Sequence, residues 1–329
     1  MRNAKLILLL LLLSGGIYAL TLIASPRPQL PPRTGHALAE TKAWGYQLQG
    51  AQPNKVPIDA DVMVIDYSRD GSGERAWTPA EITAFRTRAD GRPRIVLAYM
   101  SVGEAEIYRY YWRRHWAWRI MGRTFRPTWL GEENKEWRGN YRVRYWDPGW
   151  QALFTGTARS LFDRITELYL PWRKPYLDRV LEAGFDGVYL DRVDAFGEWE
   201  TRATAEADMA AFVASISAAA KMRKPGALVV VQNGEELLAR APYRRAIDGI
   251  AKEDLMFGVR GEEAENDARD VLKSVALLNR ARAEKLPVFV VEYVTEAGKR
   301  ARAQRRATEL GYVLHFAKRK LNAAPETGP

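Results

Sequence analysis

The sequence of 329 residues contains no cysteine and only three histidines. The lack of cysteine excludes disulfide bonds, zinc–thiolate sites, iron–sulfur clusters and a lipidated N-terminal cysteine. The histidines, His36, His115 and His315, are far apart in the chain and show no metal-ligand spacing. We therefore expect no metal site and no cofactor.

Acidic residues are fewer than basic ones, so the formal net charge is +10. A basic protein favours anionic surroundings, such as a membrane surface, a polysaccharide or a nucleic acid. The lysines and arginines are spread through the chain, however, and no recognisable nucleic-acid-binding module is present. We expect no nucleic-acid partner and a monomeric protein.

One long apolar segment, residues 6–24, follows the basic residues Arg2 and Lys5. This pattern is typical of a signal peptide, with a small residue such as Ala19 or Ala24 at the cleavage site. It also suits an uncleaved membrane anchor, because about twenty apolar residues span a bilayer. Both alternatives predict export to the periplasm or the extracellular space, and we favour cleavage.

The rest of the chain divides by composition. After the signal peptide or anchor (1–24) we expect a proline-rich linker (25–43), one large domain (44–322) and a short disordered tail (323–329). The apolar content of 47% is ordinary for a globular protein.

Short apolar runs alternate with helical patterns through the large domain. Eight strands are expected, at residues 44–49, 61–67, 94–100, 186–191, 228–233, 249–254, 287–293 and 311–316. Helices are expected clearly at residues 157–183, 203–221, 266–285 and 295–310. Eight strands that alternate with helices predict an α/β fold, a single (β/α)₈ TIM barrel. A doubly wound open sheet is less favoured, because no glycine-rich phosphate turn follows the first strand.

The gap between the third and fourth strands, residues 101–156, is rich in aromatic residues. It holds seven of the eleven tryptophans, namely Trp112, Trp116, Trp118, Trp129, Trp137, Trp146 and Trp150. Flat amphipathic rings stack on sugars, and they also form small cores. We expect most of these rings to form the core of an insertion after strand 3, and about a third to line a cleft.

The predicted strands end, one after another, in acids, amides and tyrosines. Clustered carboxylates are costly to desolvate, which favours a functional reason for a ring of polar residues at the strand ends. The most economical use is a pair of carboxyl groups that cleaves a glycosidic bond. We predict Asp191 and Glu253 as the catalytic pair, with Asp194, Glu292 and Glu104 as substitutes in that order. The expected substrate-binding residues are Asp66, Tyr67, Tyr99, Ser101, Glu104, Trp146, Asp194, Asn233, Glu292 and Tyr293.

Several segments together resemble glycoside hydrolase family 114, over roughly residues 44–316. They are AYMSVGEAEIYRYYW (98–112), GNYRVRYWDPGWQ (139–151), FDGVYLDRVDAF (185–196), VQNGEEL (231–237) and KEDL (252–255). The chain looks closest to a bacterial branch often labelled cysteinyl-tRNA synthetase-related, but no nucleotide-binding signature of a synthetase is present.

The resemblance implies an endo-α-1,4-polygalactosaminidase-like TIM barrel. It also implies catalytic carboxylates at the ends of strands four and six, which match Asp191 and Glu253. We therefore expect an exported hydrolase of carbohydrate metabolism that acts on an amino-sugar-containing polysaccharide.

Two other functions fit part of the pattern. An exported barrel with many aromatic residues could bind a polysaccharide without cleaving it. A lysine inside a barrel can form a Schiff base with a carbonyl substrate, as in aldolases, and Lys252 precedes Glu253 on the sixth strand. Residues alternate along a strand, however, so Lys252 and Glu253 are expected to point in different directions.

Overall fold

The computed structural model describes residues 36–56, 59–88, 90–120, 123–124, 126–156 and 174–322. The expected signal peptide or anchor, most of the expected linker, the expected tail and the first part of the helix expected at 157–183 lie outside the described residues. Among the helices that the structure does describe, none is long and apolar enough to cross a membrane.

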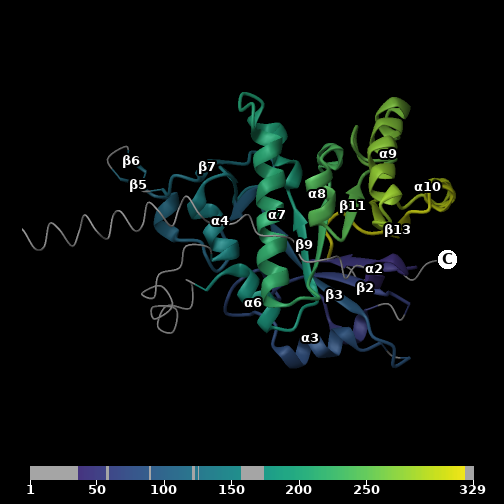
Figure 1. Cartoon of the computed structure of the whole chain (residues 1–329), viewed down its shortest axis with the longest axis horizontal. Helices are drawn as coiled ribbons and strands as arrows, with labels where there is room; N and C mark the ends of the chain where they lie inside the picture. The colour runs from purple at the N-terminus through teal and green to yellow at the C-terminus, as the bar shows by residue number, and fades with distance from the viewer. Residues whose placement is uncertain are drawn as a thin grey trace, which may run out of the picture. The chain divides into compact units, whose positions relative to one another are not determined.

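Eight parallel strands form the central sheet (Figure 1). In spatial order they are β1 (Trp44–Gln47), β2 (Val62–Asp66), β3 (Ile95–Ser101), β9 (Gly187–Asp191), β10 (Leu228–Gln232), β11 (Gly249–Glu253), β12 (Val288–Glu292) and β13 (Val313–Phe316). The last strand returns to the first, since the Trp44 indole nitrogen donates to the Val313 carbonyl oxygen at 3.0 Å. The (β/α)₈ TIM barrel is thus confirmed, and every predicted strand is present within one or two residues of its expected bounds.

Helices connect the strands and surround them (Figure 1). The described α-helices are α2 (His36–Ala39), α3 (Pro79–Arg86), α4 (Pro148–Thr155), α6 (Tyr176–Glu182), α7 (Ala205–Arg223), α8 (Ala241–Ala246), α9 (Ala268–Ala283) and α10 (Ala297–Leu310). The described 3-10 helices are η1 (Pro53–Lys55), η2 (Arg114–Ala117), η4 (Val193–Trp199) and η5 (Glu235–Ala239). α7, α9 and α10 confirm the helices expected from the sequence. α3 and α8, with eight and six residues, were not among the helices given by residue range from the sequence.

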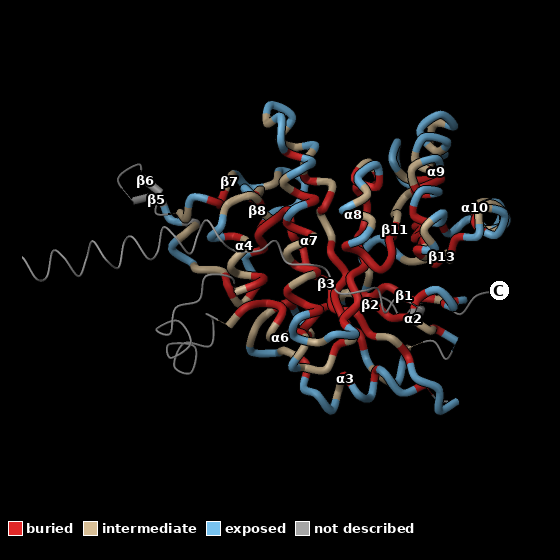
Figure 2. The backbone as a smooth tube through the Cα atoms, in the orientation of Figure 1, coloured by how far each residue is buried: buried red, intermediate tan, exposed pale blue. Residues whose placement is uncertain are grey.

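Side chains on each strand alternate between two cores. On β2, Val62 and Val64 point into the barrel, whereas Met63 and Ile65 pack in the layer between strands and helices. Both faces of most of these strands are therefore buried (Figure 2), which is why the strands read as continuous apolar runs. The inner core is filled by large rings, among them Trp44, Tyr46 and Tyr189.

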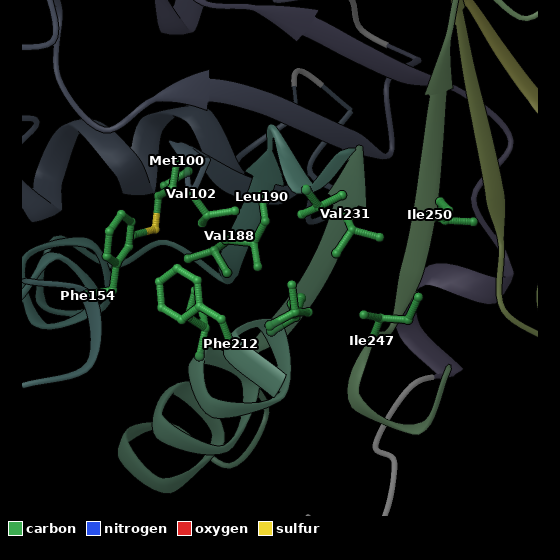
Figure 3. Packing of buried hydrophobic residues seen from close by; sticks show 14 of the residues in the cluster. Met100, Val102, Phe154, Val188, Leu190, Phe212, Val231, Ile247 and Ile250 are labelled. Atoms are coloured by element: carbon green, nitrogen blue, oxygen red, sulfur yellow. The ribbon is translucent and has the colours of Figure 1, made fainter. Parts of the chain in front are cut away.

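The outer core packs the strands against α4 and α7. In Figure 3, Met100 of β3, Leu190 of β9 and Val231 of β10 point away from the barrel interior, and Phe154 of α4 and Phe212 of α7 lie in the same layer. The rings of Phe154 and Phe212 meet edge to face at 5.5 Å. This layer holds α4, which belongs to the insertion, and α7 against the same part of the sheet.

The insertion after β3 contains strands of its own, which the sequence did not predict. β4 (Glu104–Glu106), β8 (Asn140–Val143) and β7 (Leu130–Glu133) form an antiparallel sheet, and β5 (Arg119–Ile120) pairs with β6 (Arg123–Thr124). Of the seven tryptophans, Trp129 and Trp150 are buried and Trp112, Trp116 and Trp146 pack partly buried against the core. Trp118 and Trp137 are exposed. Most of these rings therefore form a core, as expected.

The segment DPGWQ shows how the sequence starts the helix that closes the insertion. The Asp147 carboxylate accepts a hydrogen bond from the Gly149 backbone N–H at 2.7 Å, and Pro148 occupies the first turn of α4. The helix ends at Gly156 in the left-handed conformation, with φ 63°. This short, well-capped helix brings Trp150 under the end of β3, where its indole N–H donates to the Val102 carbonyl oxygen at 2.9 Å.

Candidate active site

Polar side chains that point inward gather where the parallel strands end. The strand register places Asp66 of β2 beside Tyr99 of β3, and Ser101 of β3 beside Asp191 of β9. Glu253 is the last residue of β11, two strands away from β9. In a TIM barrel this end of the strands is the catalytic face.

Asp191 is held by three donors. Its Oδ2 accepts a hydrogen bond from the Tyr99 hydroxyl at 2.7 Å, and its Oδ1 accepts one from the Gln232 side-chain amide at 3.1 Å. The backbone N–H of Arg192 also donates to Oδ1 at 2.7 Å. Gln232 is itself fixed, because its Oε1 accepts a hydrogen bond from the Tyr189 hydroxyl at 2.5 Å. The carboxyl group is therefore locked in one orientation.

Glu253 is held in a matching way. Its Oε1 accepts a hydrogen bond from the Asn233 side-chain amide at 2.9 Å, and its Oε2 accepts one from the Tyr293 hydroxyl at 3.1 Å. The Glu253 backbone N–H donates to Asn233 Oδ1 at 3.2 Å, which fixes the orientation of that amide. Asp191 and Glu253 thus each receive one amide and one phenol. Both are half-buried, whereas Gln232 and Asn233 behind them are buried.

Three neighbouring strands end in the same strained turn. Arg192, Asn233 and Asp254, which follow β9, β10 and β11, have φ values of 61°, 60° and 50°. Residues other than glycine adopt this left-handed conformation at a cost of order 1 kcal/mol or more, and such residues cluster at functional sites. Here the turn aims the Arg192 N–H at Asp191 and the Asn233 amide at Glu253.

The pKa of both carboxyl groups is raised. Burial, and then the neighbouring charges of Glu253 and Asp194, raise the pKa of Asp191 to about 7. Burial also raises the pKa of Glu253, with the Asp254 charge adding to the effect. Two interacting carboxyl groups lose their protons in two steps, and between these steps the pair carries one proton. Burial and the nearby carboxylates likewise raise the pKa of Tyr99 and Tyr293, so both phenols stay protonated and donate.

Arg192, which follows Asp191, forms ion pairs with several acidic residues. Its guanidinium lies 3.4 Å from Glu104 and 3.8 Å from Asp194, and it also pairs with Glu198. Glu104 is buried and accepts hydrogen bonds from the side-chain amides of two insertion residues, Asn134 and Asn140, at 2.6 and 3.2 Å. Asp194 remains partly exposed. Glu104 and Asp194 therefore both lie near Arg192, and Asp194 is also close enough to Asp191 to raise its pKa.

A close backbone approach brings these parts together. A Cβ atom on Gly103, just after β3, would lie 2.3 Å from the Arg192 carbonyl oxygen and 2.4 Å from the Ala195 Cβ. No other residue fits there without a shift of the backbone. The segment after β3 and the turn after β9 can therefore lie against each other only because this position is glycine.

Four of the predicted residues lie away from the pair. Tyr67 belongs to the outer core, and Trp146 packs against Trp199 and the Arg202 guanidinium. Glu292 alternates with the inward-facing Val291 and is wholly buried, and its Oε1 accepts a hydrogen bond from the Met256 N–H at 2.7 Å. Asp66 points inward but forms a buried ion pair with Arg109 at 2.7 Å.

Lys252 points to the other side of β11 from Glu253, as expected. Its ammonium group lies 3.1 Å from the carboxylate of Glu235, which also accepts a hydrogen bond from the Ser274 hydroxyl at 2.6 Å. A Schiff-base lysine has to reach the carbonyl carbon of its substrate, whereas Lys252 points away from Glu253 and its ammonium group contacts Glu235. This geometry does not favour the aldolase alternative.

Gln232, Arg109, Arg192 and Arg319 also hold the site, and none of them was predicted from the sequence as a site residue. Gln232 could have been found, because it ends a strand just before Asn233. Arg109 lies in the insertion, and Arg319 follows the last strand, where it makes two hydrogen bonds of 2.9 Å to Asp254 and covers the Tyr293 ring at 4.4 Å. No periodicity marks either arginine. Among the described residues, no group of three or more His, Asp or Glu side chains is arranged to hold a metal ion.

Two carboxyl groups at the ends of barrel strands are an arrangement that glycoside hydrolases use. Residues 24–327 match the profile of Glycoside-hydrolase family GH114, and the chain belongs to this family. It is therefore a glycosidase by family.

Relatives in distant organisms share most of its length. An uncharacterised protein of Deinococcus radiodurans is 32% identical over 302 residues, which cover 90% of this chain and 86% of that protein. An uncharacterised protein of Thermotoga maritima is 35% identical over 245 residues, or 72% of this chain and 67% of the relative.

Among solved structures, the glycoside hydrolase domain of PelA from Pseudomonas aeruginosa is similar in fold. Its TM-score is 0.60 at 17% identity, and the match covers 87% of this chain and 98% of that domain. A variant of the same domain, E218A, gives a TM-score of 0.58. At this identity the likeness supports the barrel and says nothing about the substrate.

Proposed function

We propose that the protein is an exported glycoside hydrolase that cleaves an amino-sugar-containing polysaccharide, of the α-1,4-galactosaminan type, with Asp191 and Glu253 as the catalytic pair. One observation carries this proposal. The two carboxyl groups lie at the ends of barrel strands, each is oriented by one amide and one phenol, and burial raises the pKa of both.

A glycosidase needs one protonated and one ionised carboxyl group at once. The protonated carboxyl donates its proton to the glycosidic oxygen as the bond from that oxygen to the anomeric carbon breaks. The ionised carboxyl attacks the anomeric carbon or activates a water molecule that does so. A single shared proton leaves one group in each state, and the fixed hydrogen bonds spare the site any reorganisation during the step.

The electrostatics of the site support a cationic sugar. The whole chain carries a net charge of +10, but Asp191, Glu253 and the partly exposed Asp194 lie together at the catalytic face. Carboxylates attract the ammonium group of a sugar that lacks its acetyl group. The site is therefore suited to amino sugars although the protein as a whole is basic.

The test is a panel of soluble polysaccharides incubated with the purified protein, with reducing ends measured over time. The panel contains α-1,4-galactosaminan at several degrees of N-acetylation, chitosan and a neutral α-1,4-glucan. We expect cleavage of the galactosaminan alone, with oligosaccharide products if the action is endo. Cleavage of the glucan at the same rate would contradict the substrate, and binding of galactosaminan without cleavage would indicate a polysaccharide-binding barrel.

Export is the part of the proposal that rests on residues 6–24. The full-length chain, produced in a bacterium and fractionated, is expected in the periplasm or the medium, shortened if the segment is cleaved. A chain that begins at residue 25 is expected to stay in the cytoplasm. Equal distribution of the two chains would contradict export.

A further inference from the structure

The most unusual group near the site that the proposed reaction does not use is the buried arginine Arg109. It lies just after β4, at the start of the insertion, and its side chain is 1% exposed. Its Nη1 lies 2.9 and 2.7 Å from the two oxygens of Asp66, and its Nε lies 2.6 Å from Glu106. The ends of β2 and β4 are thus joined through one guanidinium.

Such a cluster is hard to explain by folding stability alone. Buried ion pairs cost desolvation energy, and apolar residues of similar size are often as stable or more stable in their place. Here two carboxylates face one cation, and burial raises the pKa of Asp66 to about 6 despite the opposing effect of the Arg109 charge. Asp66, Glu106 and Arg109 thus occupy a buried site that apolar side chains of similar size could fill.

The guanidinium also faces the ring that holds the catalytic carboxyl. Arg109 lies 5.7 Å from the centre of the Tyr99 ring and 4.9 Å from that of Tyr108, whose hydroxyl donates to Glu106. The hydroxyl of Tyr99 is the donor that reaches Asp191 at 2.7 Å. Asp66 and Tyr99 are also direct neighbours in the pairing of β2 with β3. A continuous series of contacts therefore runs from the insertion through Arg109 and Tyr99 to Asp191.

Glycine permits the close contact of the insertion with the loop after β2. Gly71 has φ 82°, and a Cβ atom there would lie 2.4 Å from the Tyr108 ring. Tyr108 therefore lies directly on this loop while it covers Arg109. The cluster is built from the barrel and the insertion together, and it exists only when the insertion is docked.

We infer that Arg109 is a positioning residue for Asp191: it holds the Tyr99 ring so that the phenol donates to the carboxyl group, and it couples the docking of the insertion to the state of the catalytic pair. The inference rests on the proposed function for its meaning in catalysis. The geometric part, that Arg109 acts on Asp191 through Tyr99, can be measured without any substrate.

Several charged and titratable groups face Asp191 and have to be kept constant. They are Glu253 from β11, Asp194 and Arg192 from the turn after β9, Tyr46 from β1, Tyr99 from β3 and Tyr189 from β9 itself. The Tyr99 hydrogen bond is the largest effect that lowers the pKa of Asp191. Loss of this bond is therefore expected to move the titration of Asp191 to higher pH.

The experiment is a double-mutant cycle of Arg109→Met and Tyr99→Phe. The titration of Asp191 is followed by NMR in protein labelled with carboxyl-¹³C aspartate, and its resonance is assigned by its loss in Asp191→Asn. We expect both single variants to raise the midpoint and the double variant to equal Tyr99→Phe. Arg109→Lys, which keeps the charge but not the planar fork, is expected to restore only part of the wild-type midpoint.

Two outcomes would overturn the inference. If Arg109→Met shifts the midpoint by the same amount with and without the Tyr99 hydroxyl, Arg109 acts by direct electrostatics. If the midpoint stays unchanged while the melting temperature falls, Arg109 is structural only. Should Arg109→Met fail to fold because two carboxylates are left buried, the neutral triple variant Asp66→Asn, Glu106→Gln, Arg109→Met takes its place in the same cycle.

Activity separates this inference from the proposed function. If the wild-type protein cleaves galactosaminan, kcat of Arg109→Met should fall on the order of tenfold to a hundredfold with little change in KM. If the wild-type protein cleaves nothing but the NMR cycle behaves as expected, the proposed function fails and the positioning role stands. Cleavage by the wild-type protein with an additive cycle would contradict the positioning role alone.

Discussion

Asp191 and Glu253 are both half-buried carboxyls, but the groups around them differ. Asp191 has three donors and lies near two other carboxylates, while Glu253 has two donors and lies next to Asp254. Donors favour the charged form, and burial and like charges favour the neutral form. These opposing effects leave the pair with one proton over a limited range of pH.

The first prediction is a bell-shaped dependence of kcat/KM on pH. Both pKa values are raised, so at low pH both groups are protonated and no nucleophile or base remains. Asp191 loses its proton as pH rises through about 7, and once both groups are charged the general acid is lost. Rates measured from pH 4 to 9 should therefore fall on the alkaline side. A rate that stays constant up to pH 9 would contradict the shared proton.

Glu292 shows that an acid at a strand end can be structural. It is wholly buried on the outward side of β12, where it anchors the loop after β11, and its Oε2 has no hydrogen-bond partner in the described part of the chain. Burial raises its pKa from 4.5 to about 8. The folded protein therefore favours the neutral carboxylic acid. The stability that this provides is fully present below pH 4.5 and is lost as pH rises through about 8.

The second prediction follows from this sign. Glu292→Gln cannot ionise, so it should melt close to the wild-type temperature at pH 5 and above it at pH 9. In the ideal case the shift in the pKa of Glu292 corresponds to a change in the free energy of unfolding on the order of 4 kcal/mol between pH 5 and pH 9. We expect the variant to recover part of this free energy. Thermal denaturation at both values of pH is the measurement, with Glu309→Gln on the exposed face of α10 as control. A variant that is less stable than the wild type at pH 9 would contradict the raised pKa of Glu292.

At the scale of the elements, the turn after β9 depends on the segment after β3. The third prediction is that Gly103→Ala destabilises the protein by roughly 1–3 kcal/mol, because the added methyl group meets the Arg192 carbonyl oxygen. It should also lower kcat, since the Arg192 N–H is displaced from Asp191. Gly197→Ala in η4 is the matched control, because a Cβ atom there meets nothing within 4 Å. Equal stability of both variants would contradict the close approach.

The segment after β13 closes the site on the side of Glu253. The Leu321 carbonyl oxygen accepts hydrogen bonds from the Leu48 and Gln49 N–H groups, each at 3.0 Å, and the same segment carries Arg319. Arg319 neutralises Asp254 and supports the Tyr293 ring. An unpaired Asp254 would raise the pKa of Glu253 further, because its charge already does so in part.

The fourth prediction concerns Arg319→Met, which keeps the apolar bulk over Tyr293 and removes the charge. The titration of Glu253, followed in carboxyl-¹³C glutamate protein, should move to higher pH, and kcat should fall by about a factor of ten. Arg302→Met, which breaks an exposed ion pair of α10 with Glu265, should leave both unchanged. If the titration of Glu253 does not move in Arg319→Met, the pairing with Asp254 has no part in the site.

The elements also show what a sequence can tell. Most of the eight strands were predictable because they are buried on both faces and stop at a polar residue, as β9 stops at Asp191. The side of the sheet to which the last residue of a strand points was not always predictable. On β12 both Val290 and Val291 are apolar, so the sequence does not say that Glu292 points outward. The sheet of the insertion was also missed, because its strands have two to four residues and no clear alternation.

Some residues of the site could likewise be predicted from the sequence, and others could not. Asp191 and Glu253 could be proposed from the sequence because they end strands that are otherwise apolar, and Tyr99, Asn233 and Tyr293 lie within one or two residues of such ends. Arg109 and Arg319 could not, since each reaches the site from a segment far along the chain. Their effect depends on tertiary contacts that leave no local pattern.

At the scale of the whole molecule, the barrel positions the two carboxyl groups, and the insertion supplies side chains around them. The barrel brings Asp191 and Glu253 to one face. The insertion adds the amides that hold Glu104, the guanidinium of Arg109 and a partly buried set of tryptophans. Membership of family GH114 covers residues 24–327, so both parts belong to the matched region.

The central claim is that these two carboxyl groups cleave a glycosidic bond. The most direct measurement is the release of reducing ends from partly deacetylated α-1,4-galactosaminan by the wild-type protein, Asp191→Asn, Glu253→Gln and the control Glu309→Gln. We predict that the wild type and the control cleave equally, and that the other two variants bind the polymer but cleave at least about a thousandfold more slowly. Cleavage by either of those variants at the wild-type rate would contradict the account.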